Sequence, residues 1–347
     1  MTKVLPQGKL KDFLKDTMDK YSLVAPVRED GVVVLKPTAD PEAVVTDYLN
    51  TVTSPKDFFF PQTERMFRFQ KTEGKIRVEE TTWQGKRVIF GVRPCDLGSL
   101  ELIDRVFQEG EYEETYYLAR RENTTVVGLA CSSPGPTCFC TTFGITPGSP
   151  EGADLMLYPD GEGFVVEVLT EKGEALAQQT ETLLEDQDVD LAEVKGRFEG
   201  LKVPLGDHLS VDGVAAKLDG MFEHPVWAEL SPRCLGCGIC TYLCPTCHCF
   251  GMTDEVRGDQ GVRLRCWDSC QFSDFTRMAG GHNPRPTKKE RVRQRFMHKL
   301  NYYVHRFGRY LCTGCGRCLE KCPVGLTMVH VIEKVNDSGT REVAVNE

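Results

Sequence analysis

The stretch Cys234-Leu-Gly-Cys237-Gly-Ile-Cys240-Thr-Tyr-Leu-Cys244-Pro245 decides the fold of the C-terminal part of the chain. A second stretch repeats its spacing, Cys312-Thr-Gly-Cys315-Gly-Arg-Cys318-Leu-Glu-Lys-Cys322-Pro323. In this C-x2-C-x2-C-x3-C-P pattern, three thiolates bind three corners of an iron–sulfur cubane, and the fourth cysteine binds the other cluster. The repeat therefore predicts two [4Fe-4S] clusters. The expected ligands are Cys234, Cys237, Cys240 and Cys322 for the first cluster, and Cys312, Cys315, Cys318 and Cys244 for the second.

Two other interpretations explain less of this pattern. Structural zinc also binds cysteines that lie two residues apart, but it needs only two such pairs. Zinc leaves unexplained the third cysteine and the Cys-Pro step, each of which occurs twice. The spacing Cys240-x3-Cys244-x2-Cys247 is typical of radical S-adenosylmethionine clusters, yet it requires two cysteines that the repeated motif already uses. We therefore favour the ferredoxin-type pair.

The composition is that of a globular metal protein. The 347 residues correspond to about two or three domains. The 51 acidic against 42 basic side chains argue against a nucleic-acid binder, because phosphate contacts need a positive surface. No apolar run approaches the ~18–20 residues that span a bilayer, and no apolar stretch follows the N-terminal lysines as in a secretory signal. We therefore expect a soluble cytoplasmic protein, and in that reducing compartment sixteen cysteines indicate metal.

A third cluster is predicted just after the first motif. Cys247 and Cys249 form a C-x-C pair, which suits a metal better than a disulfide, and Cys270 follows about twenty residues later. The alternative is plain buried thiols. The fourth ligand is either Cys266 or His282, and a lone histidine is the weaker choice on residue type alone.

The N-terminal half contains a fourth candidate set. Cys95 and Cys131 each follow an expected strand, and Cys138-Phe-Cys140 repeats the C-x-C arrangement. Neighbouring parallel strands bring their C-terminal ends together, and ligand sites of open α/β sheets collect there. These four cysteines therefore form a plausible cluster site, with zinc or simple burial as the alternatives.

The pattern of apolar residues predicts an α/β N-terminal domain, residues 1–215, followed by a mainly α-helical two-[4Fe-4S] ferredoxin-type domain, residues 216–335, and a polar tail, residues 336–347. The first domain is expected to have helices at 9–21, 41–50, 97–108 (capped by Asp96) and 171–198, strands at 31–35, 87–92 and 124–130, and a loop at 144–163. In the second domain we expect little strand and one long helix, 288–307.

Helix 288–307 is unusually basic, with nine Lys or Arg against the single Glu290 between residues 285 and 309. Such a charge run is usually a solvated face. Here it also suits two other roles, because cations near a thiolate-bound cluster raise its reduction potential and a basic surface can dock an acidic partner. No glycine-rich nucleotide motif, catalytic triad or carboxylate pair stands out. We therefore expect no nucleotide or flavin to be bound by this chain alone, and a chain that holds a row of redox centres.

Several motifs together resemble a known family, the beta subunits of soluble NAD(P)-linked nickel–iron hydrogenases (sulfhydrogenases). The resemblance rests on residues 234–250, on Arg265-Cys-Trp-Asp-Ser-Cys-Gln-Phe272 and on Ala279-Gly-Gly-His-Asn-Pro-Arg-Pro-Thr-Lys-Lys289. Phe58-Phe-Phe60, Arg93-Pro-Cys-Asp96, Cys131 and Cys138-Phe-Cys140 match less tightly but in the same order. The chain is also similar, more distantly, to the electron-transfer subunit of anaerobic sulfite reductase. The resemblance covers most of the chain.

The resemblance implies an electron-transfer subunit inside a complex. It implies a flavin-containing, NAD(P)H-binding partner on one side and a catalytic partner on the other. That catalytic partner would be a hydrogenase, with a siroheme sulfite reductase or a heterodisulfide-reductase-type bifurcating complex as alternatives. The family pattern keeps cysteines at Cys247, Cys249 and Cys270 and a histidine at His282 but none at Cys266, which favours His282 or an incomplete third cluster. A free-standing ferredoxin-like carrier and a zinc-scaffold protein are the competing hypotheses.

Overall fold

The structure, a computed structural model, describes residues 1–108 and 112–338. The chain forms two compact units that exchange chain several times. The first unit comprises Met1–Gly135, Ile145–Lys202 and Met252–Cys266. The second comprises Pro136–Gly144, Val203–Gly251 and the chain from Trp267 onwards. No helix in the described part of the chain has the length and apolar character needed to cross a bilayer.

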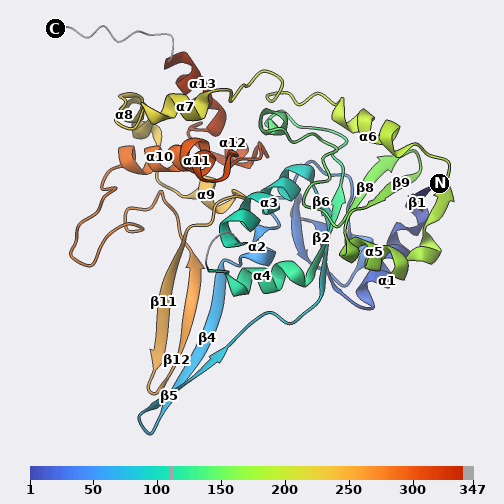
Figure 1. Cartoon of the computed structure of the whole chain (residues 1–347), viewed down its shortest axis with the longest axis horizontal. Coiled ribbons are helices and arrows are strands. Elements are labelled where there is room, and N and C mark those ends of the chain that lie inside the picture. Colours follow the sequence, from blue (N-terminus) through green and yellow to red (C-terminus); the bar gives the residue numbers. More distant parts are fainter. Residues whose placement is uncertain (109–111, 339–347) are drawn as a thin grey trace. The chain divides into compact units, whose positions relative to one another are not determined.

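The first unit is built on an eight-stranded mixed sheet (Figure 1). Its strand order is β10-β1-β9-β8-β7-β6-β2-β3. The strands are β1 (Thr2–Pro6), β2 (Ser22–Glu29), β3 (Val32–Pro37), β6 (Arg87–Val92), β7 (Thr124–Leu129), β8 (Leu155–Asp160), β9 (Gly163–Val168) and β10 (Glu185–Gln187). The four strands β2, β6, β7 and β8 run parallel in the middle, and the outer pairs are antiparallel. The expected α/β domain is therefore a mixed-sheet domain.

The central strands β6 and β7 place two candidate cysteines at one edge of this sheet. All six residues of each strand are buried, as expected for parallel strands covered on both faces. Helices surround the sheet: α1 (Leu10–Met18), α2 (Lys56–Phe59), α3 (Pro94–Gln108), α4 (Thr115–Glu122), α5 (Glu171–Gln179) and α6 (Leu191–Glu199). The sequence predicted strands β6 and β7 correctly. Cys95 lies in the first turn of α3 directly after β6, and Cys131 follows β7.

The start of α3 differs from the prediction. Asp96 does not cap the helix, because α3 begins at Pro94 and Asp96 lies in its first turn, buried. Proline is favoured at the first position of a helix, where its missing N–H has no intrahelical partner to lose. The Arg93-Pro94 step therefore sets the beginning of the helix two residues before the predicted cap.

Two predicted helices of the first unit are wrong. Only Pro41–Ala43 makes a short 3-10 turn in the segment 41–50, because the backbone then runs beside β2, where Val45 N–H donates to Pro26 O at 2.9 Å. The segment 171–198 contains two helices, α5 and α6, separated by another 3-10 turn and the edge strand β10. Its uniformly polar composition hides that interruption.

The predicted loop 144–163 is also wrong in its second half. Leu155–Asp160 forms β8, which pairs with β7 on one side and β9 on the other. The first four residues of β8 are buried. The Gly, Pro and Asp residues on both sides of this apolar run led the prediction towards a loop.

A second, four-stranded antiparallel sheet combines two distant parts of the sequence. Its order is β11-β12-β4-β5, with β4 (Thr63–Thr72), β5 (Lys75–Glu80), β11 (Phe250–Arg257) and β12 (Gln260–Trp267). The prediction of little strand in the C-terminal part is therefore wrong for residues 250–267. Strands β5 and β11 are largely exposed, so they lack the buried apolar face that makes a strand visible in a sequence.

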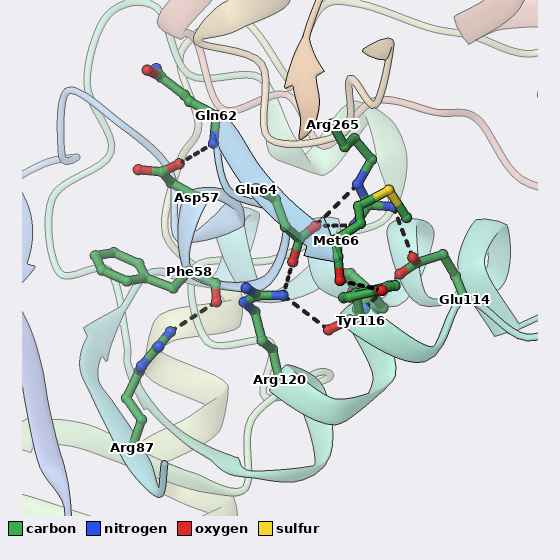
Figure 2. Close-up of polar contacts among 11 residues, drawn as sticks. Asp57, Phe58, Gln62, Glu64, Met66, Arg87, Glu114, Tyr116, Arg120 and Arg265 are labelled. Atoms are coloured by element: carbon green, nitrogen blue, oxygen red, sulfur yellow. Dashed lines mark hydrogen bonds and ion pairs between the residues drawn. The ribbon is translucent and has the colours of Figure 1, made fainter. Parts of the chain in front are cut away.

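A buried ion network fixes this second sheet to α4 (Figure 2). Glu64 of β4 pairs with Arg265 of β12 and with Arg120 of α4, and Arg265 Nη1 also lies 2.9 Å from Glu114 Oε1. The side chains of Glu64 and Arg265 are 1% and 2% exposed. The network therefore joins three segments that are far apart in the sequence.

The second unit contains helices around its own apolar core. They are α7 (Val214–Asp219), α8 (Val226–Leu230), α9 (Ile239–Tyr242), α10 (Lys288–Met297), the π-turn η6 (His298–Tyr302), α11 (Tyr303–Phe307), α12 (Arg317–Lys321) and α13 (Met328–Ser338). The predicted helix 288–307 is present as the continuous run α10-η6-α11. The predicted tail 336–347 is helical as far as Ser338, and residues 339–347 lie outside the described part. Trp227, Phe296 and Val331 are among the fully buried core residues.

Candidate metal centres

Four of the predicted ligands line one cavity of the second unit. Cys234, Cys237 and Cys240 come from the first motif and Cys322 comes from the end of the second. Around them lie Gln271, Arg295, Phe296 and Leu326. Gly236 N–H donates to Cys234 Sγ at 3.3 Å, the type of backbone-to-sulfur contact that tunes a cluster. The cavity thus groups the same four cysteines that the sequence assigns to the first cluster.

The other four predicted ligands line a second cavity. Cys312, Cys315 and Cys318 come from the second motif and Cys244 comes from the end of the first. The lining also includes the apolar side chains of Phe139 and Met328 and the cations Arg295 and Lys299. Each motif therefore supplies three cysteines to one cavity and its Cys-Pro cysteine to the other.

The two motifs fold alike because each has glycines at the same two positions. Gly236 and Gly238 in the first motif, and Gly314 and Gly316 in the second, all have positive φ angles between 62° and 79°. Such a backbone is readily available only to glycine. Gly238 then caps α9 and Gly316 caps α12, so each motif is a left-handed turn that leads into a short helix.

The surroundings of the cavities strongly affect the charges of their side chains. Burial raises the pKa of the Cys312 thiol to about 12 and also raises the pKa of Cys318. Burial disfavours the charge of Arg295 and Lys299, yet the nearby thiols more than offset this and raise the pKa of both cations above their ordinary values. The buried cations and the thiols thus favour each other's charged forms.

The residues predicted for a third cluster are partly together. The thiols of Cys249 and Cys270 hydrogen-bond each other, which lowers the pKa of Cys270 to about 6. Cys247 shares a hydrogen bond with Cys244 and lies 3.9 Å from Arg295 Nη1. His282 belongs to the same unit and is exposed, whereas Cys266 lies in β12 of the first unit, opposite Thr63.

Two histidines also lie beside this third set. His248 Nδ1 is 3.1 Å from Thr246 O, and its ring meets the ring of His298 edge-on, with 5.4 Å between centroids. Burial, with the neighbouring His248, lowers the pKa of His298 to about 3. His298 is therefore a neutral imidazole at physiological pH.

The N-terminal set is divided between the units. Cys95 and Cys131 belong to the first unit, at the C-terminal ends of the neighbouring parallel strands β6 and β7. Cys138 and Cys140 belong to the second unit, where Cys138 O accepts a hydrogen bond from Leu205 N–H at 3.2 Å and Phe139 N–H donates to Gly314 O at 3.0 Å. The expected meeting of Cys95 and Cys131 at one sheet edge is thus present within the first unit.

Comparison with known proteins agrees with this geometry. Residues 233–326 match the family model of the 4Fe-4S dicluster domain. The chain is 35% identical to the sulfhydrogenase 2 subunit beta of Pyrococcus furiosus over 328 residues, which is 94% of this chain and 96% of the relative. The chain belongs to the sulfhydrogenase beta-subunit family. No solved structure matches it significantly.

This family membership confirms the predicted family, and the matched domain confirms the prediction of an iron–sulfur protein with [4Fe-4S] clusters. The donor set of this sulfhydrogenase-family chain suits such clusters, because each cavity combines four thiols with at least one buried cation. Among the described residues, no three His, Cys, Asp or Glu side chains converge as they would on a single metal ion. A cubane has four irons, so its ligands stand farther apart than those of a mononuclear site.

The sequence reasoning missed three residues at the cavities. Gln271 lines the first cavity, where Cys234 Sγ lies 3.8 Å from its Oε1, and its Nε2 lies 3.4 Å from Cys270 Sγ. Arg295 and Lys299 were considered only as part of a basic run. Their spacing was a usable signal, because they alternate with the buried Val292, Phe296 and Leu300 on one helical face. Basic residues inside an apolar stripe indicate a buried charge that needs a partner.

Proposed function

We propose that this chain is the iron–sulfur electron-transfer subunit of a hydrogenase-type complex. The observation that carries the proposal is the pair of cavities, each lined by three cysteines of one motif and one cysteine of the other. A [4Fe-4S] cluster bound there takes up and gives away one electron at a time. The cysteines act as ligands, and the cavities carry no group placed as a nucleophile or a general base.

The proposed ligands follow the sequence pattern. Cys234, Cys237, Cys240 and Cys322 hold the first cluster, and Cys244, Cys312, Cys315 and Cys318 hold the second. A third cluster uses Cys247, Cys249 and Cys270 with His282 as the fourth ligand. The contact between Cys249 and Cys270 supports this group, while the exposure of His282 requires that its side chain turn inwards when the cluster binds.

A fourth cluster uses Cys95, Cys131, Cys138 and Cys140. The parallel pairing of β6 with β7 supports the first two of these ligands, because it brings the chain after both strands to the same sheet edge. Cys95 is also in the first turn of α3, a 15-residue helix. The N-terminal end of a helix stabilises a thiolate through its free N–H groups.

The partners in this proposal are a flavin-containing NAD(P)H-binding subunit together with a catalytic redox subunit of the hydrogenase type, in the cytoplasm. The relative is itself named as one subunit of a sulfhydrogenase. The first test measures iron and acid-labile sulfide in protein purified without oxygen, together with electron paramagnetic resonance of the reduced sample. About eight irons per chain supports two clusters, and about twelve to sixteen supports the additional ones. Zinc in place of iron contradicts the whole proposal.

The partner assignment needs its own experiment. A tagged chain, expressed in its native host and isolated without oxygen, is expected to bring with it a flavoprotein and a nickel-containing subunit in fixed proportions. A monomer that retains its clusters without either partner would instead support a free-standing ferredoxin-like carrier. Siroheme or a heterodisulfide-reductase-type subunit in the preparation would replace hydrogenase as the terminal partner.

A further inference from the structure

The helical run 288–307 contains two buried cations that no carboxylate neutralises. Arg295 is 4% exposed and Lys299 is 2% exposed. Their neighbours Lys289 and Arg293 on the same helix both pair with Glu223. Among the described residues, no Asp or Glu forms an ion pair with Arg295 or Lys299. A buried charge is costly without a partner of opposite sign, so both side chains call for an anion nearby.

The two cations are distributed unequally between the cavities. Arg295 lines both the first and the second cavity, and its Nη1 also lies 3.9 Å from Cys247 Sγ. Lys299 lines the second cavity only. The arrangement therefore gives the first cavity one buried positive charge and the second cavity two.

Neutral groups hold Lys299 in place. Its Nζ donates to Thr246 Oγ1 at 2.7 Å and to Leu311 O at 3.0 Å, and its own backbone O accepts from Leu311 N–H at 2.9 Å. Lys299 also lies in η6, the π-turn of the helix, a feature that often marks functional sites. Thr246 and Leu311 stand next to the second-cavity motif ends, so the ammonium is fixed beside that cavity with its charge intact.

We propose that Arg295 raises the reduction potentials of both ferredoxin-type clusters, whereas Lys299 raises the potential of the second cluster alone. The inference rests on the proposed function, because it requires clusters in both cavities. Reduction takes one electron into each cluster, from the 2+ to the 1+ core, and so adds one negative charge. A fixed buried cation stabilises the reduced form more than the oxidised form, which raises the potential.

The test is a potentiometric titration of the full chain, with dithionite as reductant, followed by electron paramagnetic resonance. Cys237→Ser and Cys315→Ser identify which signal belongs to which cavity. Lys299→Met is expected to shift the reduction equilibrium of the second cluster at least tenfold towards oxidised, which is 59 mV for one electron, and to leave the first unchanged. Arg295→Met is expected to lower both potentials. Arg293→Met is the matched control, because Arg293 lies on the same helix and lines neither cavity.

Charge-conserving variants separate charge from packing. Arg295→Lys and Lys299→Arg are expected to restore most of the potential, and equal shifts in the Met and the charged variants would overturn the proposal. Where Arg295→Met fails to retain iron, the two potentials of Lys299→Met decide, and a shift in neither cluster or equally in both overturns it. Wild-type iron content tests the proposed function separately. Wild type with both signals and no selective shift contradicts this inference alone.

Discussion

Single glycines differ sharply in what the two motifs can tolerate. Gly236 and Gly314 occupy matching positions, and both have positive φ angles. A Cβ at Gly236 would meet nothing nearer than Gln271 O at 3.6 Å, whereas a Cβ at Gly314 would overlap the backbone carbonyl of Phe139. The segment around Phe139 thus packs directly on the second motif and leaves no room for a side chain there.

We therefore expect Gly314→Ala to lose the second cluster. Both Gly→Ala variants cost about 1–2 kcal/mol for the left-handed backbone, but only Gly314→Ala also displaces backbone. The measurement is iron per chain after anaerobic purification, where Gly314→Ala is expected to hold about four irons fewer than wild type. Gly236→Ala is the matched control and is expected to keep its iron. Equal losses in the two variants would show that φ strain alone governs the motif.

Glu64 is the residue on which the second sheet depends most. It is buried between Arg265 and Arg120, so Glu64→Gln leaves guanidinium groups short of a buried counter-charge. Breaking a buried pair in this way costs about 3–5 kcal/mol. Hydrogen exchange of β4 and β12 is expected to accelerate by about a hundredfold or more, since each 1.4 kcal/mol is a factor of ten.

Asp254→Asn gives the matched control for this variant. Asp254 pairs with Arg263 in the same sheet, but both side chains are well exposed. Exposed pairs contribute about 0–1 kcal/mol. An exchange rate in Glu64→Gln no faster than in Asp254→Asn would mean that the buried network does not hold the sheet.

At the scale of elements, the long basic helix has a defined beginning. Thr287 Oγ1 accepts from Lys289 N–H, and the Glu290 carboxylate accepts from Thr287 N–H at 2.9 Å, so the two side chains form a capping box. Thr287→Ala removes the cap and is expected to cost about 1 kcal/mol. Hydrogen exchange should quicken in the first turn of α10, while Thr287→Ser keeps wild-type protection. Faster exchange reaching η6 would contradict a local role for the cap.

Elements with a buried apolar pattern were predictable from the sequence, and exposed ones were not. Strand β6 was predicted to the residue because all six of its side chains are apolar or buried. Strand β10 consists of Glu185, Asp186 and Gln187, all exposed, and nothing in three polar residues indicates a strand. The hairpin β11-β12 escaped for the same reason, since its stability depends on pairing with the distant β4.

The candidate sites show the same division. The grouping of eight cysteines into two sets of four follows from a spacing that covalent geometry restricts, so it could be stated from the sequence. The places of Gln271 and Arg295 depend on how separate elements pack, and no local pattern contains that information. The choice between Cys266 and His282 stays a prediction, because it depends on a side-chain movement on cluster binding.

At the scale of the whole molecule, the two units differ in how far they depend on iron. The core of the first unit consists of aliphatic and aromatic residues from the sheet and its helices, such as Leu23, Phe90 and Val127. The core of the second unit packs against cluster ligands, including Cys234, Cys312 and Cys322. Where a metal site forms only in the folded state, its binding free energy becomes folding free energy.

Removal of the clusters should therefore unfold the second unit and spare the first. After treatment with ferricyanide and a chelator, we expect amide protection to be lost in α10 and α13 and retained in β6 and β7, measured by hydrogen exchange with mass spectrometry. Reconstitution with iron and sulfide should restore the lost protection, which excludes oxidative damage as the cause. Loss of protection in both units together would mean that they fold as one cooperative body, and unchanged protection in both would mean that the second core is stable without its clusters.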